Sequence, residues 1–154
     1  MNDRQPKDIV TAASAALNGE SPQKFLAEIQ ETLVAAQREI DACNPQCDAC
    51  GRCCLFETAG HRLYVSTGEL ALLLSGEIPP KNGPLHCRWQ ISDRCTVRET
   101  RPLGCRVFYC KTDLCDIYEK FHRKLVNIHK KYGISYFYAE MTAAAEEFYS
   151  THRH

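Results

Sequence analysis

Ten cysteines crowd into the middle of this 154-residue chain and constrain its fold more than any other feature. All ten lie between Cys43 and Cys115, and both ends of the chain contain none. A disulfide framework would more often spread its cysteines, and no apolar leader near the N-terminus directs export to an oxidising compartment. In a reducing cytosol, closely spaced thiols usually hold a metal or carry out redox chemistry. The clustering therefore favours a metal-binding centre.

The first group of cysteines has the spacing of a metal-binding loop. Cys47, Cys50 and Cys53 follow one another with two-residue gaps, and Cys54 adjoins the last of them. Such gaps let successive thiolates turn toward one centre in zinc and iron–sulfur sites. The run matches bacterial ferredoxins better than the two separated C-x2-C pairs of a zinc ribbon, although the Cys-Pro expected after a ferredoxin run is missing. The spacing indicates a metal and leaves iron or zinc open.

A second group of cysteines supplies enough thiols for a further centre. Neighbouring side chains in extended backbone point to opposite sides, so Cys53 and Cys54 favour two centres or one larger cluster over a single ion with one thiol packed inward. The expected remaining ligands are Cys87, Cys95, Cys105 and Cys110. Together the two groups suit two four-thiolate centres, and Cys43 and Cys115 are expected to be spare thiols.

Arginines accompany the cysteines along the sequence. Metal-bound thiolates carry excess negative charge, which nearby guanidinium groups can neutralise. Arg101 and Arg106, inside the segment RPLGCRVFYC, are candidates for this role, with a solvated basic face or an Arg106–Glu99 ion pair as an equal alternative. For the remaining arginines near cysteines we expect a solvated basic face: Arg52, Arg88, Arg94 and Arg98.

Outside the cysteine groups, apolar residues recur every three or four positions, which predicts helices. The expected helices cover residues 7–17, about 20 residues after Ser21-Pro22, a short stretch capped by Ser66 or Thr67, residues 116–131 ended by Gly133, and residues 134–150. The apolar stripe of the second helix is expected to dock within the domain rather than on a second copy of the chain, and it consists of Phe25, Ile29, Leu33, Ala36 and Ile40. The fold class is therefore mainly α, a small helical domain with an irregular cysteine-rich centre. It divides into a helical segment 1–42, a metal-binding segment 43–115, and C-terminal helices 116–154 packed on it.

The two cysteine blocks resemble a known family. Cys47, Cys50, Cys53 and Cys54 reproduce the C-x2-C-x2-C-C signature of the YkgJ-like cysteine-cluster proteins, and residues 95–106 resemble that family's C-x-(I/V)-Y-x-x-R-P-x-x-C-R block. Arg98 departs from the pattern, where the family commonly has an aromatic residue. The resemblance covers residues 43–115. It implies a zinc- or iron-chelating domain and no particular reaction.

The charge balance and the hydropathy of the chain bear on which classes of partner it can bind. The chain has 19 basic residues (Lys and Arg) and 19 acidic residues (Asp and Glu). Its net charge therefore gives no support to nucleic-acid binding. The longest apolar run, Leu70 to Leu74, is far shorter than the roughly 18 residues of a membrane span. We expect a cytoplasmic protein whose partners are a metal ion or cluster and a redox protein.

His122 and His129 are expected to be a partly exposed pair, and Glu69 to face water.

Three functions fit these patterns. An iron–sulfur cluster, of the 4Fe–4S type if four thiolates bind it, would serve electron transfer or redox sensing, and all-cysteine ligation favours it. Structural zinc in an interaction module is the first alternative. Disulfide exchange at Cys47-x-x-Cys50 is the second alternative, and it is less favoured than the other two because no strand precedes the motif. No acid–base dyad, phosphate loop or nucleophile triad is evident, so enzymatic activity stays an open question.

Overall fold

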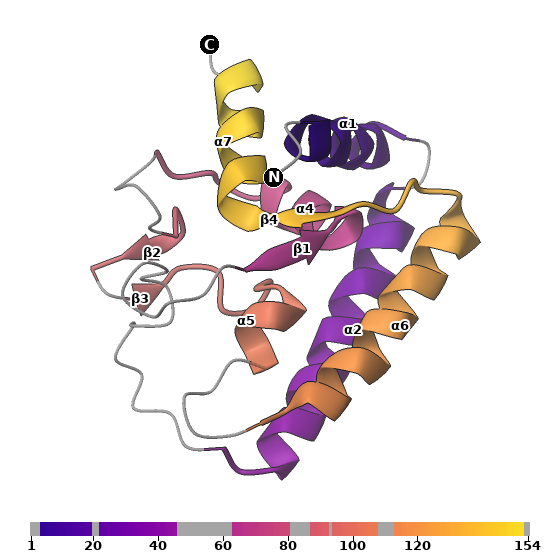
Figure 1. The fold of residues 1–154 in the computed structure, drawn as a ribbon, viewed down its shortest axis with the longest axis vertical. Coiled ribbons are helices and arrows are strands. Elements are labelled where there is room, and N and C mark those ends of the chain that lie inside the picture. The colour runs from indigo at the N-terminus through magenta and orange to yellow at the C-terminus, as the bar shows by residue number, and fades with distance from the viewer. Residues whose placement is uncertain are drawn as a thin grey trace.

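The computed structural model describes residues 4–19, 22–45, 63–80, 87–92, 94–107 and 113–152 (Figure 1). Over these residues the chain is mainly helical, as predicted. The helices are α1 (Arg4–Leu17), α2 (Pro22–Ala42), α4 (Thr67–Leu74), α5 (Leu103–Val107), α6 (Cys115–Tyr132) and α7 (Met141–His152). The strands are β1 (Tyr64–Ser66), β2 (Gln90–Ile91), β3 (Arg94–Cys95) and β4 (Tyr138–Glu140). None of the described helices is both long enough and apolar enough to cross a membrane.

Helices α2 and α6 lie side by side along one edge of the molecule (Figure 1). The buried stripe of α2 consists of the predicted residues: Phe25, Ile29, Leu33, Ala36 and Ile40. Helix α6 faces it with buried Phe121, Leu125 and His129. The predicted docking of the amphipathic helix within the domain is therefore confirmed. Solvent-exposed ion pairs such as Lys131–Glu28, at 2.8 Å, add little to the stability of this helix pair.

Helix α4 forms the centre of the core. All eight of its residues are buried, as expected of a helix surrounded by other elements rather than resting on the surface. It packs against both α1 and α2. The buried cluster around it includes Ile9 from the first predicted segment, Leu70 from the second and Leu125 from the third. One core thus combines side chains from all three segments.

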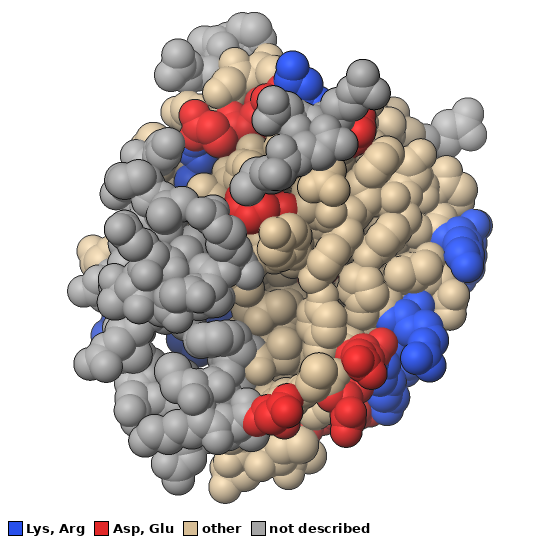
Figure 2. Space-filling model, viewed as in Figure 1, with Lys and Arg blue, Asp and Glu red and all other residues tan. Residues whose placement is uncertain are grey.

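Two short antiparallel pairs connect distant parts of the chain. Strand β1 pairs with β4, with Val65 opposite Ala139, and β2 pairs with β3, with Gln90 opposite Cys95. The prediction of one helix over 134–150 is wrong for residues 134–140, since α7 begins only at Met141. The reason is long-range pairing: the backbone N–H of Met141 donates to Leu63 O at 2.8 Å. On the face of the molecule drawn in Figure 2, the surface over β1 is uncharged, and charged side chains lie along α6.

The first turn of α4 is held by groups from β1, from α6 and from the loop before β4. Ser66 is the N-cap, as predicted, and its side chain forms a capping box with Glu69. The N–H of Thr67 donates to Phe137 O at 3.1 Å, and the N–H of Gly68 donates to His129 Nε2 at 2.9 Å. A Cβ on Gly68 would lie 2.7 Å from Ile29 Cδ1 and 3.0 Å from His129 Cε1, so a larger residue there would require these two side chains to shift. The amides that a helix start leaves unpaired are thus bonded inside the protein.

Candidate functional site

Half of the cysteines lie in the described part of the chain. They are Cys43 after α2, Cys87 before β2, Cys95 in β3, Cys105 in α5 and Cys115 at the start of α6. No disulfide joins any two of these five. The other predicted ligands, and one arginine, lie outside the described residues: Cys47, Cys50, Cys53, Cys54, Cys110 and Arg52. Cys43 and Cys115, expected to be spare thiols, are exposed.

Within the described ranges, no three His, Cys, Asp or Glu side chains are grouped so that they could hold a metal ion. A complete thiolate site would therefore need ligands from outside the described residues, such as Cys110 or the first cysteine group. Cys87 is buried and belongs to the apolar core cluster together with Trp89. A cysteine in such a place also serves as a small apolar side chain. The ligand set stays a prediction from the sequence.

Arg106 is the most unusual charged residue of the described region. Its side chain is only 3 % exposed. Its Nε donates to Arg101 O at 2.8 Å, its Nη2 to Glu99 O at 2.7 Å and its Nη1 to Gln37 Oε1 at 3.3 Å. The alternative of an Arg106–Glu99 ion pair is wrong, because the guanidinium binds the backbone carbonyl of Glu99. Arg106 thus ties the loop before α5 to α2.

The electrostatic surroundings of Arg106 include two predicted ligands. Burial, and then the neighbouring charge of Arg101, lower the pKa of Arg106 to about 10. Cys105, then Glu69 and Cys95, act in the opposite direction, because negative charge on any of them stabilises the guanidinium. One cysteine comes from α5 and the other from β3. Negative charge on either cysteine would therefore favour the buried cation of Arg106.

Glu69 fixes the position of the segment that carries Cys105 and Arg106. It is 2 % exposed, so the expectation that it faces water is wrong. Its Oε1 accepts from Ser66 N at 3.0 Å, and its Oε2 accepts from Leu103 N, the first residue of α5, at 2.6 Å. Burial raises the pKa of Glu69, although these hydrogen bonds act to lower it. One carboxyl group thus links the starts of α4 and α5.

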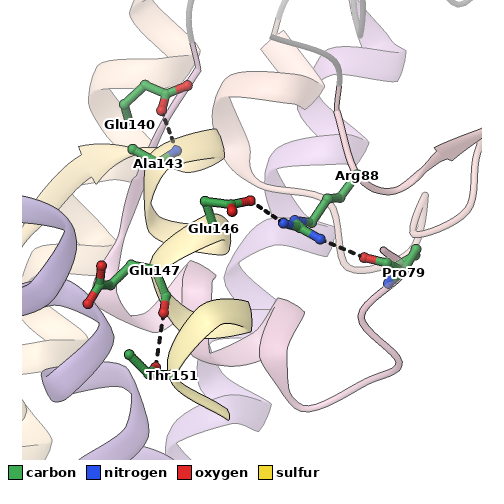
Figure 3. Close-up of polar contacts among 7 residues, drawn as sticks. All are labelled: Pro79, Arg88, Glu140, Ala143, Glu146, Glu147 and Thr151. Carbon is green, nitrogen blue, oxygen red and sulfur yellow. Dashed lines mark hydrogen bonds and ion pairs between the residues drawn. The ribbon is translucent and has the colours of Figure 1, made fainter. Parts of the chain in front are cut away.

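Arg88 has a purely structural environment (Figure 3). It is 5 % exposed, which contradicts the expectation of a solvated basic face. Its guanidinium pairs with Glu146 of α7, donates to Pro79 O at 3.1 Å and lies 4.5 Å from the centre of the Tyr149 ring. These contacts hold α7 against the loop after α4. Arg94 and Arg98 are exposed, as expected.

His129 is buried rather than partly exposed, while His122 is half-buried. The Nε2 of His129 accepts from Gly68 N, so its Nδ1 carries the proton and donates to Leu125 O at 2.7 Å. His122 Nε2 and the Tyr136 hydroxyl form a hydrogen bond at 2.7 Å. The expectation of an exposed pair therefore fails for His129, which is held neutral between α4 and α6.

Acid should destabilise the protein through His129. Burial lowers the pKa of its imidazole below the unfolded value of about 6.5. The unfolded chain then binds more protons, so the free energy of unfolding falls as pH drops below about 6.5, by at most about 1.4 kcal/mol per pH unit for this group. Urea denaturation between pH 7.5 and 5 measures the slope. His129→Gln should flatten it relative to the exposed control His152→Gln, and equal slopes in both variants would refute this assignment.

Comparison with family models, curated proteins and solved structures finds no match for this chain. The likeness to YkgJ-like cysteine-cluster proteins therefore rests on the sequence motifs alone. Sequence reasoning placed Arg101 and Arg106 near the thiols but missed Glu69 and Gln37, which position them. In the sequence, Glu69 is marked only by the helix start at Ser66, and Gln37 only by its place on the polar edge of α2. Neither pattern identifies a distant partner.

Proposed function

We propose that this chain binds an iron–sulfur cluster through cysteine thiolates and uses it for electron transfer or redox sensing. The foremost ligands are Cys47, Cys50, Cys53 and Cys105, followed by Cys54, Cys87, Cys95 and Cys110. The motif spacing and the likeness to YkgJ-like proteins support this ligand set. Arg101 and Arg106 would lie beside the bound group and balance its charge.

The observation that carries the proposal is the buried guanidinium of Arg106 beside two cysteines. Within the described residues Arg106 forms no ion pair with a carboxylate. Burying a cation costs several kcal/mol, by an order-of-magnitude estimate, and Glu69 is the one carboxylate among the described residues whose charge is seen to act on Arg106. Metal-bound thiolates from Cys95 and Cys105 would add further negative charge beside the guanidinium. The chemistry of the residues present therefore fits a thiolate-ligated metal.

The arginines also have a chemical role in this proposal. When bound, an iron–sulfur cluster supplies one-electron transfer at a potential that depends on nearby charge and on hydrogen bonds to sulfur. A guanidinium has five N–H donors, and three nitrogen atoms of Arg106 each use one. The remaining donors can bond to sulfur. Arg106 would thereby stabilise the more negative, reduced form.

Matched cysteine variants test this assignment. Cys105→Ser should lose most of the bound iron and acid-labile sulfide, because it removes a ligand beside Arg106. Cys115→Ser, which changes an exposed thiol at the start of α6, should keep the metal content of the unmodified chain. Metal and sulfide analysis of anaerobically purified variants measures both. Equal metal content in the two variants would remove Cys105 from the ligand set, and zinc without sulfide would favour the structural zinc module.

A further inference from the structure

A groove of about 590 Å³ lies between α2 and the segment 98–106. Its volume falls within the range of small-molecule sites. The lining residues are Gln30, Val34, Gln37, Arg38 and Asp41 from α2, and Arg98, Glu99, Arg101 and Arg106 from the facing segment. Arg106 forms a fixed part of the wall, because it is almost completely buried and each of its nitrogen atoms already holds a backbone or amide oxygen.

The charges of this groove are unbalanced. Among the described lining residues, four arginines face two carboxylates, Asp41 and Glu99, which leaves an excess of two positive charges in the absence of a bound cluster. None of the four forms an ion pair with a carboxylate within the described ranges. Asp41 instead accepts from Gln37 Nε2 at 2.9 Å. A dianion would neutralise the groove, and guanidinium forks match the oxygens of a phosphate group.

Two polar atoms of the groove lack partners among the described residues. They belong to two lining residues, as the donor Nε of Arg101 and the acceptor Oε1 of Gln30, and both atoms are buried behind the groove wall, so a ligand would reach them only after a small side-chain movement. Buried polar atoms are normally hydrogen-bonded, so these two indicate a ligand that offers both an acceptor and a donor. A phosphate oxygen would accept from Arg101. A hydroxyl group of the same molecule would donate to Gln30.

We propose that this groove binds a small organic phosphate. The size of the groove, its excess of positive charge and its unpaired donor and acceptor together fit a phosphate monoester that carries hydroxyl groups. A nucleic acid fits less well, because the whole chain has equal numbers of basic and acidic residues and attracts no polyanion at long range. The proposal goes beyond metal binding, since half of the groove comes from α2, which carries none of the predicted ligands.

Titration calorimetry of the full-length chain with pyrophosphate as the probe, at fixed ionic strength, tests the site. Saturable binding should weaken about tenfold in both Arg38→Gln and Arg98→Gln, each of which removes a charged hydrogen bond from the exposed rim. The control Arg123→Gln changes an exposed arginine of α6 outside the groove and should bind as the unmodified chain does. Sulfate at equal ionic strength should not compete at the probe concentration.

Three results would overturn the proposal. They are the absence of saturable binding, an equal loss of affinity in the Arg123 control, and tighter binding of citrate or of a short single-stranded RNA than of pyrophosphate. Metal and sulfide content is measured on the same samples. Failure of phosphate binding at unchanged metal content refutes the groove alone, while lost metal with intact phosphate binding refutes the cluster alone.

Discussion

Replacing Glu69 with alanine lowers the free energy of unfolding by about 3 to 5 kcal/mol, because it leaves buried donors without an acceptor. Glu69 accepts from the backbone N–H groups of Ser66 and Leu103 and from the Ser66 hydroxyl. Each buried N–H left unpaired costs roughly 1 to 3 kcal/mol, and the Ser66 hydroxyl loses its acceptor as well. The start of α5, with Cys105 and Arg106, loses its attachment to α4 in the same step.

Urea denaturation followed by circular dichroism measures this loss. The matched control is Glu77→Ala, which changes an exposed carboxylate in the loop after α4 and should alter stability by less than about 0.5 kcal/mol. A Glu69→Ala variant as stable as the control would show that the carboxyl group does not hold the two helix starts together. Reduced metal content in Glu69→Ala, with all cysteines intact, would in turn link α5 to the proposed metal centre.

Replacing Cys50 with serine should release the metal and unfold the cysteine-rich region. Binding free energy at a structural metal site is also folding free energy, of order 10 kcal/mol for zinc-finger peptides, which is comparable with the total stability of a small domain. The helices α1, α2, α6 and α7 lie outside segment 43–115 apart from the first residue of α6, so much of the helical signal should persist. New protease cleavage sites should appear within 43–115.

The control for this variant is Cys43→Ser, at an exposed cysteine just after α2. Metal analysis, thermal unfolding and limited proteolysis are compared between the two variants. Retained metal together with an unchanged melting temperature in Cys50→Ser would exclude Cys50 as a ligand. Loss of metal from both variants to the same extent would assign Cys43 to the site as well.

Local sequence patterns predicted the helical part of the fold well. The stripe from Phe25 to Ile40, the cap at Ser66 and the stop at Gly133 each depend on residues within a few positions of one another. Gly133 adopts a left-handed conformation with φ of 65°, which explains why α6 ends there. The β1–β4 pair was not predicted, because its strands have three residues each and lie far apart in the chain.

Burial of charged residues was the other feature that sequence could not give. Glu69 bonds to Leu103, 34 positions away, and Arg106 bonds to Gln37, 69 positions away. Nothing in either local sequence distinguishes such residues from ordinary solvated charges. The candidate ligands were identified from cysteine spacing, whereas the polar groups that position Cys105 and line the groove became evident only once α2, α4 and α5 were placed together.

Anaerobic purification followed by metal and acid-labile sulfide analysis decides whether the cysteines hold an iron–sulfur cluster. A visible absorption spectrum is recorded on the same sample. The proposal predicts a brown protein that contains both iron and sulfide. Colourless protein with one or two zinc ions per chain, or protein that binds neither metal after reconstitution, would contradict it.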